Sequence, residues 1–200
     1  MGFGPKKGSI MKVTKDEAIK AMETVIDYIA KEGRDEHTEG TARRFIKAWD
    51  DDWAEGYDYE MKFTTFTAGD VDQMVIELDI PVLSHCSHHL APIIGVCHIG
   101  YIPTDRIVGL SKLNRTVEKF ARRLQVQERL TSQIAQELFD KLKPLGIGVQ
   151  IVAEHMCVSS RGVRHHGART VTNKLLGCFT DSEVKQEFFN SINSHTRIKK

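Results

Sequence analysis

The stretch HCSHHLAPIIGVCH, residues 85–98, contains two cysteines and four histidines within fourteen positions. Thiolates and imidazoles bind zinc, and they also serve as nucleophiles, general acids and general bases. The same residue types also occur as packing residues that happen to lie together in a core. The spacing within this stretch, and any second group of ligands elsewhere in the chain, must distinguish these possibilities.

Cys86 and His89 form a C-x-x-H pair, a spacing that lets two side chains from one turn converge on a metal ion. One such pair cannot complete a closed four-ligand zinc site. A second group follows at His155-Met156-Cys157, inside an alternating segment that predicts a strand. Residues two apart on a strand point to the same face, so we expect His155 and Cys157 to face the same way.

Cys86, His89 and Cys157 together supply three ligands, and catalytic zinc is held by three protein ligands with one position left open. The open position carries a water molecule whose pKa zinc lowers towards about 7. His88 and His155 remain beside it as unligated imidazoles, which suit general acid–base chemistry near neutral pH.

The other cysteines and histidines have simpler interpretations. Cys97 and Cys178 are expected to be buried core thiols. His98 alternates within a predicted strand, so we expect it at the surface or in an interface. His165 and His166 lie in a basic, glycine-flanked loop and are expected to be solvated.

Several polar residues of a predicted helical segment are candidates for anion binding, but they do not by themselves indicate a phosphate site. Ser111, Lys112 and Arg115 lie at its start, where backbone N–H groups and cations favour an anion, although most helix charges are simply solvated. Gln127 and Glu128 lie in a short break, LQVQERL. A carboxylate beside an amide can bind the edge of a guanine, and the alternative is an ordinary exposed pair.

The order of predicted elements indicates an α+β fold, because helices and strands segregate instead of alternating strictly. Residues 14–31 and 38–54 predict two helices, the first with a capping box at Thr14 and Glu17. Strand-rich segments follow from residue 60, with a turn at 103–106. We then expect a helical segment over 111–143, two strands, and a short C-terminal helix.

We therefore expect a flexible lead at 1–13, a helical region at 14–59 and a catalytic domain at 60–200. Lysine and arginine number 28 and aspartate and glutamate 27, so the net charge of +1 requires neither a nucleic acid nor an anionic membrane as partner. No apolar run approaches the length of a membrane span, and residues 1–13 lack the apolar centre of a signal peptide. These features predict a cytoplasmic protein with reduced cysteines.

Five motifs together resemble the zinc-dependent GTP cyclohydrolase I family: CSHH at 86–89, GLSKLNR at 109–115, FARRLQVQERLTSQIA at 120–135, HMC at 155–157 and SRGVRHHGARTVT at 160–172. The resemblance extends from about residue 14 to the C-terminus and includes the segment TARRFIKAWDDDWAEGYDY. It implies a tunnelling fold, in which antiparallel sheets backed by helices assemble across subunits.

The resemblance also implies a reaction and an assembly. GTP and water are converted to 7,8-dihydroneopterin triphosphate and formate, a first step of pterin, folate or deazaguanine biosynthesis. The active sites lie between the subunits of a homo-oligomer, a toroidal decamer of two stacked pentamers.

Residue roles carry over by position. The resemblance implies zinc as cofactor, held by Cys86, His89 and Cys157. It makes His155 the acid for the imidazole ring of guanine, and His88 the acid–base on the ribose. It implies that substrate is bound by Gln127 and Glu128 at the guanine, by Ser111, Lys112, Arg115 and Arg161 at the triphosphate, and by Arg44 and Lys47 reaching a neighbouring site.

Two departures from the family pattern stand out. Ser87 replaces the usual glutamate of C-E-H-H, and a carboxylate there can orient a ligand imidazole. Ala42 stands where proline is common in a first helical turn. Two other hypotheses therefore remain: a homologue that binds GTP and zinc without turnover, and a metal-independent nitrile reductase of the same fold.

Overall fold

The computed structural model describes residues 13–198, and its internal contacts divide the chain into two compact units at Asp52–Trp53. The flexible lead expected at 1–13 lies outside the described residues except for Val13. Within the described part of the chain, no helix is both long enough and apolar enough to cross a membrane.

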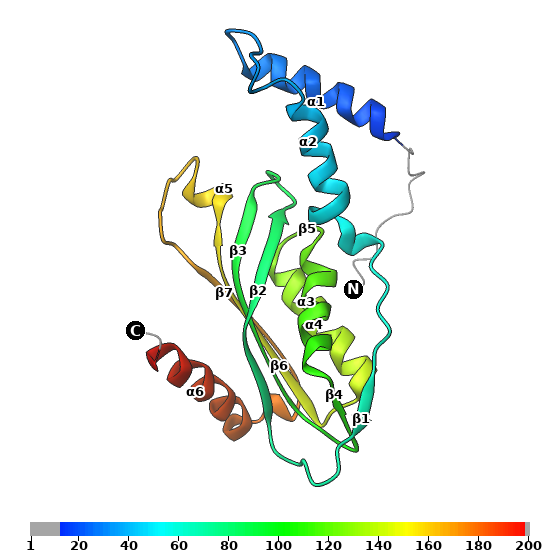
Figure 1. The fold of residues 1–200 in the computed structure, drawn as a ribbon. Helices are drawn as coiled ribbons and strands as arrows, with labels where there is room; N and C mark the ends of the chain where they lie inside the picture. Colours follow the sequence, from blue (N-terminus) through cyan, green and yellow to red (C-terminus); the bar gives the residue numbers. More distant parts are fainter. Residues whose placement is uncertain (1–12, 199–200) are drawn as a thin grey trace, which may run out of the picture. The chain divides into compact units, whose positions relative to one another are not determined.

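The first unit contains the expected pair of helices, α1 (Lys15–Ile29) and α2 (Thr41–Ala48), followed by a π-helical turn, Trp49–Trp53 (Figure 1). The predicted capping box is confirmed, since Thr14 Oγ1 accepts from Glu17 N–H and the Glu17 carboxylate accepts from Thr14 N–H. Ile19 and Ile26 of α1 pack with Ala42 of α2 in a small core. Helix α2 begins at Thr41 instead of residue 38, because Gly40 before it adopts a left-handed conformation.

The second unit is an α+β structure, as expected from the sequence. Its main sheet has the strand order β5-β2-β3-β6-β7, with all neighbours antiparallel except β5, which runs parallel to β2. A separate pair joins β1 to β4. The elements are the 3-10 turn Glu55–Tyr57, β1 (Thr65–Thr67), β2 (Val75–Cys86), β3 (Pro92–Ile102), β4 (Arg106–Val108), α3 (Leu110–Ala121), β5 (Leu124–Gln125), α4 (Gln127–Leu142), β6 (Gly146–His155), α5 (Met156–Ser159), β7 (Thr170–Gly177), the 3-10 turn Cys178–Thr180 and α6 (Ser182–Ile198).

Helices α3 and α4 cover one face of this sheet and form the main core with it. Apolar residues at steps of four along α4 are buried there: Leu130, Ile134, Leu138 and Leu142. Each such side chain contributes about 1.5–3 kcal/mol by its burial. The single helical segment expected over 111–143 is two helices, because the predicted break at LQVQERL contains β5, which pairs with the end of β2.

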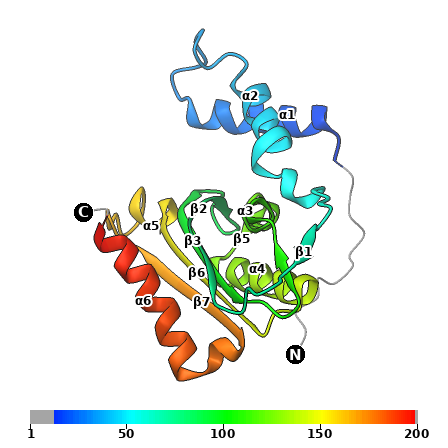
Figure 2. The same cartoon turned by 60° about the horizontal axis from the view of Figure 1, so that its bottom comes forward.

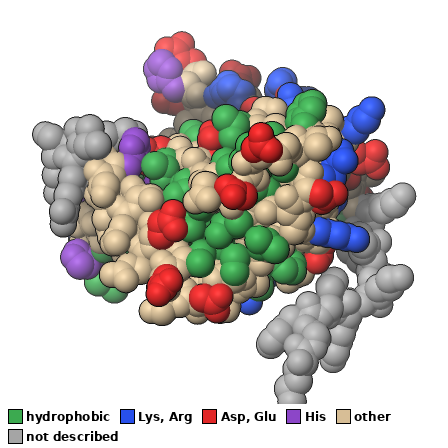
Figure 3. All heavy atoms as spheres, turned by 90° about the horizontal axis from the view of Figure 1, so that it is seen from below, with side chains coloured by type: hydrophobic (Ala, Val, Ile, Leu, Met, Phe, Trp, Pro, Cys, Tyr) green, Lys and Arg blue, Asp and Glu red, His purple; other side chains and the backbone are tan. Residues whose placement is uncertain are grey.

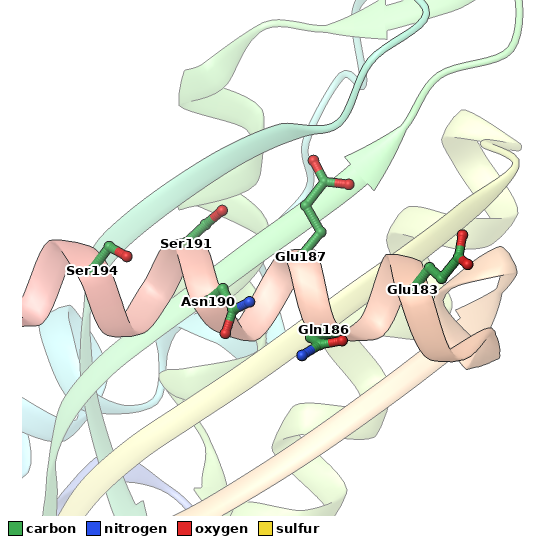
Figure 4. A pocket seen from close by; sticks show the side chains of 6 residues that line it. All are labelled: Glu183, Gln186, Glu187, Asn190, Ser191 and Ser194. Carbon is green, nitrogen blue, oxygen red and sulfur yellow. The ribbon is translucent and has the colours of Figure 1, made fainter.

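Helix α6 packs on the opposite face and is longer than the short helix predicted (Figure 2). Its Phe188 and Ile192 join Phe179 in a second core. Gly100 and Gly148 make the close approach possible, since a Cβ at either position would clash with these rings. Figure 4 shows the polar side of α6, where one group of side chains projects together: Glu183, Glu187, Ser191 and Ser194.

One prediction on this face is wrong: His98 is buried instead of exposed. A bulge in β2 turns Asp79 into a left-handed conformation, and its backbone N–H donates to His98 Nδ1 at 3.1 Å. The Asp79 carboxylate also accepts from His195 Nε2 of α6. Strand alternation alone cannot anticipate a helix that covers the outer face.

Candidate metal and nucleotide site

The C-x-x-H pair lies on the tight turn between β2 and β3. Cys86 ends β2, its N–H donates to Ala91 O at 2.8 Å, and its carbonyl accepts from Leu90 N–H at 2.8 Å. Leu90 takes a left-handed conformation that closes this turn. The turn therefore holds His89 over Cys86, at the same end of the sheet where β6 finishes (Figure 1).

Cys157 lies beside the same turn, but it is carried by a different element from the one predicted. Strand β6 ends at His155, and Cys157 lies in the one-turn helix α5 instead of on a continuing strand. Ser160 Oγ donates to Met156 O at 2.6 Å and stabilises this turn. Register with β3 pairs His155 with Ile93, so the segment lies beside the turn that carries Cys86.

The ligand atoms of Cys86, His89 and Cys157 all lie within 4.8 Å of one another, as the sequence predicts for a metal centre. Two ligands of one tetrahedral zinc ion, with bonds of about 2.0–2.3 Å, lie roughly 3.5–4 Å apart. Small side-chain adjustments are therefore enough to bring the three ligand atoms to zinc-binding distances. Two thiols with one imidazole are a ligand set that zinc prefers. Cys86 is buried and His89 exposed, so the group is open to solvent on one side.

The side chains of His88 and Arg161 border this cluster. His88 N–H donates to Cys86 Sγ at 3.4 Å, and its Nδ1 lies 3.6 Å from the same sulfur. Arg161, in the bend after α5, donates from Nη1 to His89 Nε2 at 3.0 Å. Both residues are exposed, so they line the open side of the cluster.

His155 is held by the first turn of α4. Its Nε2 lies 2.7 Å from Gln127 Oε1, and Gln127 is only 1% exposed. Burial lowers the pKa of His155, and the nearby Glu128 carboxylate partly opposes this shift. The structure therefore brings His155, Gln127 and exposed Glu128 together beside the cluster.

The buried position of Gln127 excludes the alternative of an ordinary exposed pair. Its Nε2 donates to Ile151 O at 3.1 Å and to Thr170 O at 3.0 Å, and it also lies 3.1 Å from Thr172 Oγ1. The whole amide is thus occupied within the protein. Glu128, by contrast, leaves its carboxylate exposed to solvent.

Burial and the neighbouring Cys86 thiol both raise the pKa of Cys157, while the Arg161 guanidinium lowers it. Two adjacent thiols resist ionisation because two thiolates repel each other. A divalent cation between them removes this penalty, since metal ligands bind as thiolates.

Three of the predicted anion-binding residues lie elsewhere within one chain, whereas Arg161 borders the cluster. Ser111, Lys112 and Arg115 occupy the first turns of α3, where Asn114 Nδ2 donates to Glu77 Oε1 on β2 at 3.4 Å. Glu77 is near the start of β2 and Cys86 is at its end. At about 3.3 Å per strand residue, the two ends are roughly 30 Å apart.

Arg44 and Lys47 belong to the first unit, where their contacts are local. Arg44 donates to Glu39 O, His37 O and Thr41 Oγ1, and Lys47 pairs with Asp51. Both side chains are on the exposed side of α2.

One buried threonine of the second unit, Thr131, and one half-buried threonine, Thr172, were not anticipated. Thr131 Oγ1 and Thr172 Oγ1 lie 2.6 Å apart, directly behind Gln127. The alternation T-V-T at 170–172 indicates that Thr172 shares a face with Thr170. Nothing in the pattern indicates that this face meets the start of α4.

Comparison with known proteins agrees with this geometry. Residues 18–193 match the sequence profile of the family described as GTP cyclohydrolase I. GTP cyclohydrolase 1 of Pelagibacter ubique is 42% identical over 185 residues, covering 90% of this chain and 92% of that protein. GTP cyclohydrolase 1 of a Sulfurihydrogenibium species is 40% identical over 190 residues, covering 94% and 100%.

Among solved structures, the archaeosine synthase QueF-Like in its apo form aligns with 52% of this chain and 93% of its own, at 13% identity and a TM-score of 0.44. The family match spans both units and every residue of the Cys–His–Cys cluster. The chain belongs to the GTP cyclohydrolase I family.

Proposed function

We propose that this protein is a GTP cyclohydrolase, which converts GTP and one water molecule to 7,8-dihydroneopterin triphosphate and formate. The observation that carries the proposal is the convergence of Cys86, His89 and Cys157 with His155 beside them. Family membership and about 40% identity to two proteins named GTP cyclohydrolase 1 support the same activity. The reaction is the first step of pterin biosynthesis.

Zinc is the proposed cofactor of the Cys86–His89–Cys157 cluster, where it would supply a Lewis acid and lower the pKa of a water molecule at the open fourth position. His155 would transfer a proton at the imidazole ring nitrogen of guanine as that ring opens. His88, exposed beside Cys86, would act as acid and base on the ribose.

Glu128 is proposed to bind the guanine, because its exposed carboxylate can accept from both N1–H and the 2-amino group. Gln127 lies directly beside it but has its amide occupied, so its proposed contribution to guanine binding is indirect. Arg161 already reaches His89 and is suited to bind the triphosphate close to the cluster.

Ser111, Lys112 and Arg115 are proposed to bind the triphosphate in the site of another subunit. Their distance from Cys86, roughly 30 Å along β2, prevents them from reaching their own cluster. We therefore propose a homo-oligomer, with a toroidal decamer as the specific expectation. Arg44 and Lys47 would reach a neighbouring site in the same assembly.

Exposed apolar side chains support this assembly. Leu83, Ile94 and Val171 are 49%, 48% and 52% exposed on the sheet face that carries α6, beyond the part that α6 covers. At the other end of the sheet, apolar side chains gather among carboxylates on the face seen in Figure 3. Exposed Val71 and Leu145 precede the strands that start at this end. Exposed apolar side chains of this kind are typical of subunit contacts and support the proposed assembly.

The assembly has its own test, because the chain mass is 22.6 kDa. Sedimentation equilibrium of the full chain should give ten times this mass. A monomer that retains full activity would contradict the shared site.

The activity is tested with purified full-length protein, GTP and zinc, by following formate and the fluorescence of the oxidised pterin. Wild type should form both products in equal amounts, and His155→Ala should form neither while still binding zinc. Arg164→Ala is a matched control, since this exposed loop residue makes no side-chain hydrogen bond among the described residues. GTP binding by wild type without either product would overturn the proposal.

Ser87 favours one alternative, a homologue that binds GTP and zinc without turnover. Its backbone N–H donates to Gln125 O at 2.9 Å and its side chain is exposed, so no carboxylate orients the neighbouring imidazoles from this position. If wild type proves inactive, Ser87→Glu distinguishes the cases: recovered activity would identify Ser87 as the cause.

A further inference from the structure

Two threonines behind the site are connected to His155 through one amide. Thr131 lies on α4 and Thr172 on β7, and neither touches the proposed cluster of metal ligands. Gln127 stands between them and His155. The direction of each hydrogen bond in this chain of contacts follows from the chemistry of its atoms.

The orientation of the Gln127 amide is determined by two backbone carbonyls. Ile151 O and Thr170 O can only accept, so the group facing them, at 3.1 and 3.0 Å, is the amide NH₂. Its oxygen therefore faces His155. Because an amide oxygen also only accepts, Nε2 of His155 must carry a hydrogen across the 2.7 Å contact.

The threonine hydroxyls complete a directed ring. Thr131 Oγ1 donates to the backbone carbonyl of Gln127 at 2.8 Å. It therefore accepts from Thr172 Oγ1 across 2.6 Å. Thr172 Oγ1, having used its hydrogen, can only accept from Gln127 Nε2 at 3.1 Å, and it shares one of the two amide hydrogens with a backbone carbonyl. Each hydroxyl donates once and accepts once, so only one orientation of the amide satisfies the whole ring.

We propose that Thr131 and Thr172 are positioning residues that hold the Gln127 amide so that His155 presents Nδ1 to the substrate. This inference rests on the proposed function for its catalytic meaning. With Nε2–H donated to Gln127, neutral His155 keeps its lone pair on Nδ1, which makes no hydrogen bond among residues 13–198. Nδ1 is thus the nitrogen left for proton transfer.

The ring also explains why the imidazole is held at the strand end. His155 is the last residue of β6, and the ladder with β3 ends at its pairing with Ile93. Gln127 ties it to α4, and Thr172 ties Gln127 to β7. Three elements therefore meet at one amide. Without the threonine hydroxyls only the two carbonyls orient the amide, so its contact with the imidazole is less tightly constrained.

The test uses Thr131→Val and Thr172→Val, which keep the side-chain shape and remove the hydroxyl, and Thr131→Ser and Thr172→Ser, which keep the hydroxyl. The direct readout is the ¹⁵N–¹H signal of His155 Nε2 in full-length protein with labelled histidine. Wild type and the serine variants should show a hydrogen-bonded, slowly exchanging Nε2–H. The valine variants should lose its protection from exchange by about tenfold or more.

The kinetic readout separates positioning from folding. The valine variants should lose about 10- to 100-fold in kcat, with KM for GTP and zinc content unchanged, because the threonines touch neither ligand. Thr116→Val is the matched control for Thr131→Val, since Thr116 is equally buried and its Oγ1 donates to the Lys112 carbonyl by the same helical spacing. It should leave both readouts unchanged.

The outcomes distinguish this inference from the proposed function. If Nε2–H protection is unchanged in both valine variants, the positioning role fails whatever the activity. If protection falls but wild type forms no product, the ring is confirmed and the cyclohydrolase proposal fails. If kcat falls equally in the serine and valine variants, the loss is due to packing and the inference is overturned.

Discussion

Gly148→Ala tests how closely α6 is packed on the sheet. A Cβ at this position would lie 2.6 Å from Phe179 Cδ1 and 3.0 Å from Phe188 Cε1, where contacts below 3.0 Å force a shift. Both rings are fully buried and pack edge to face with centroids 5.5 Å apart.

The expected loss follows from these distances. Overpacking a well-packed core costs about 1–3 kcal/mol, while removing a glycine from a strand returns about 0.5–1 kcal/mol. At the middle of these ranges a net loss of about 1 kcal/mol remains, and for a chain of this length it lowers Tm by about 2–4 °C. Zinc content should not change, because Gly148 is at the opposite end of β6 from His155.

Thermal unfolding at fixed protomer concentration measures the loss, and a double-mutant cycle identifies its cause. Phe179→Val removes the ring atoms that the new methyl would meet. The double variant should therefore be more stable than the sum of the two single losses predicts, by about 1 kcal/mol or more. Strictly additive losses would refute the clash with Phe179.

Three further predictions concern other parts of the second unit. Burial disfavours the charged form of Glu137, but hydrogen bonds from Lys119 and Lys141 outweigh this effect and hold the pKa of Glu137 below 4.5. The Glu137 carboxylate therefore stabilises the fold above pH 4.5, and this stabilisation is lost as the pH falls through the lowered pKa. Glu137→Gln should thus cost about 1 kcal/mol at pH 7 by denaturant titration, and a difference that persists at pH 3 would contradict the ion pairs. Ile134→Ala should cost about 2–5 kcal/mol in the same titration, because its fully buried side chain leaves a cavity in the core. Chelation should lower the Tm of wild type and zinc should restore it, whereas His89→Ala should show neither effect.

Local patterns predicted much of the fold. The capping box at Thr14 and the buried stripe from Leu130 to Leu142 follow from spacing that depends on one helix alone. The Cys–His–Cys cluster was also predictable, although for one wrong reason. Cys157 was expected on a strand with His155, and it lies in α5 instead, yet both routes bring its sulfur towards Cys86.

What could not be predicted depends on contacts between distant elements. His98 is buried because α6 and the bulge at Asp79 cover it, and strand alternation carries no information about that cover. The ring formed by Gln127, Thr131 and Thr172 requires the register of β7 against β6 and the placement of α4 behind both. Neither register nor helix placement is contained in a local pattern.

The strand order leaves β7 at the edge of the main sheet, and this has a consequence for the life of a newly made chain. Over Thr170–Gly177 the outer backbone groups of β7 lack a neighbouring strand within residues 13–198, and Lys174 is the only charged residue of the strand. The unpaired backbone groups of such an edge can form hydrogen bonds with a strand of another chain, whether or not that pairing is the correct one. A newly made chain with this open edge is therefore exposed to aggregation, and the yield of folded protein depends on the rate of correct strand pairing relative to mispairing.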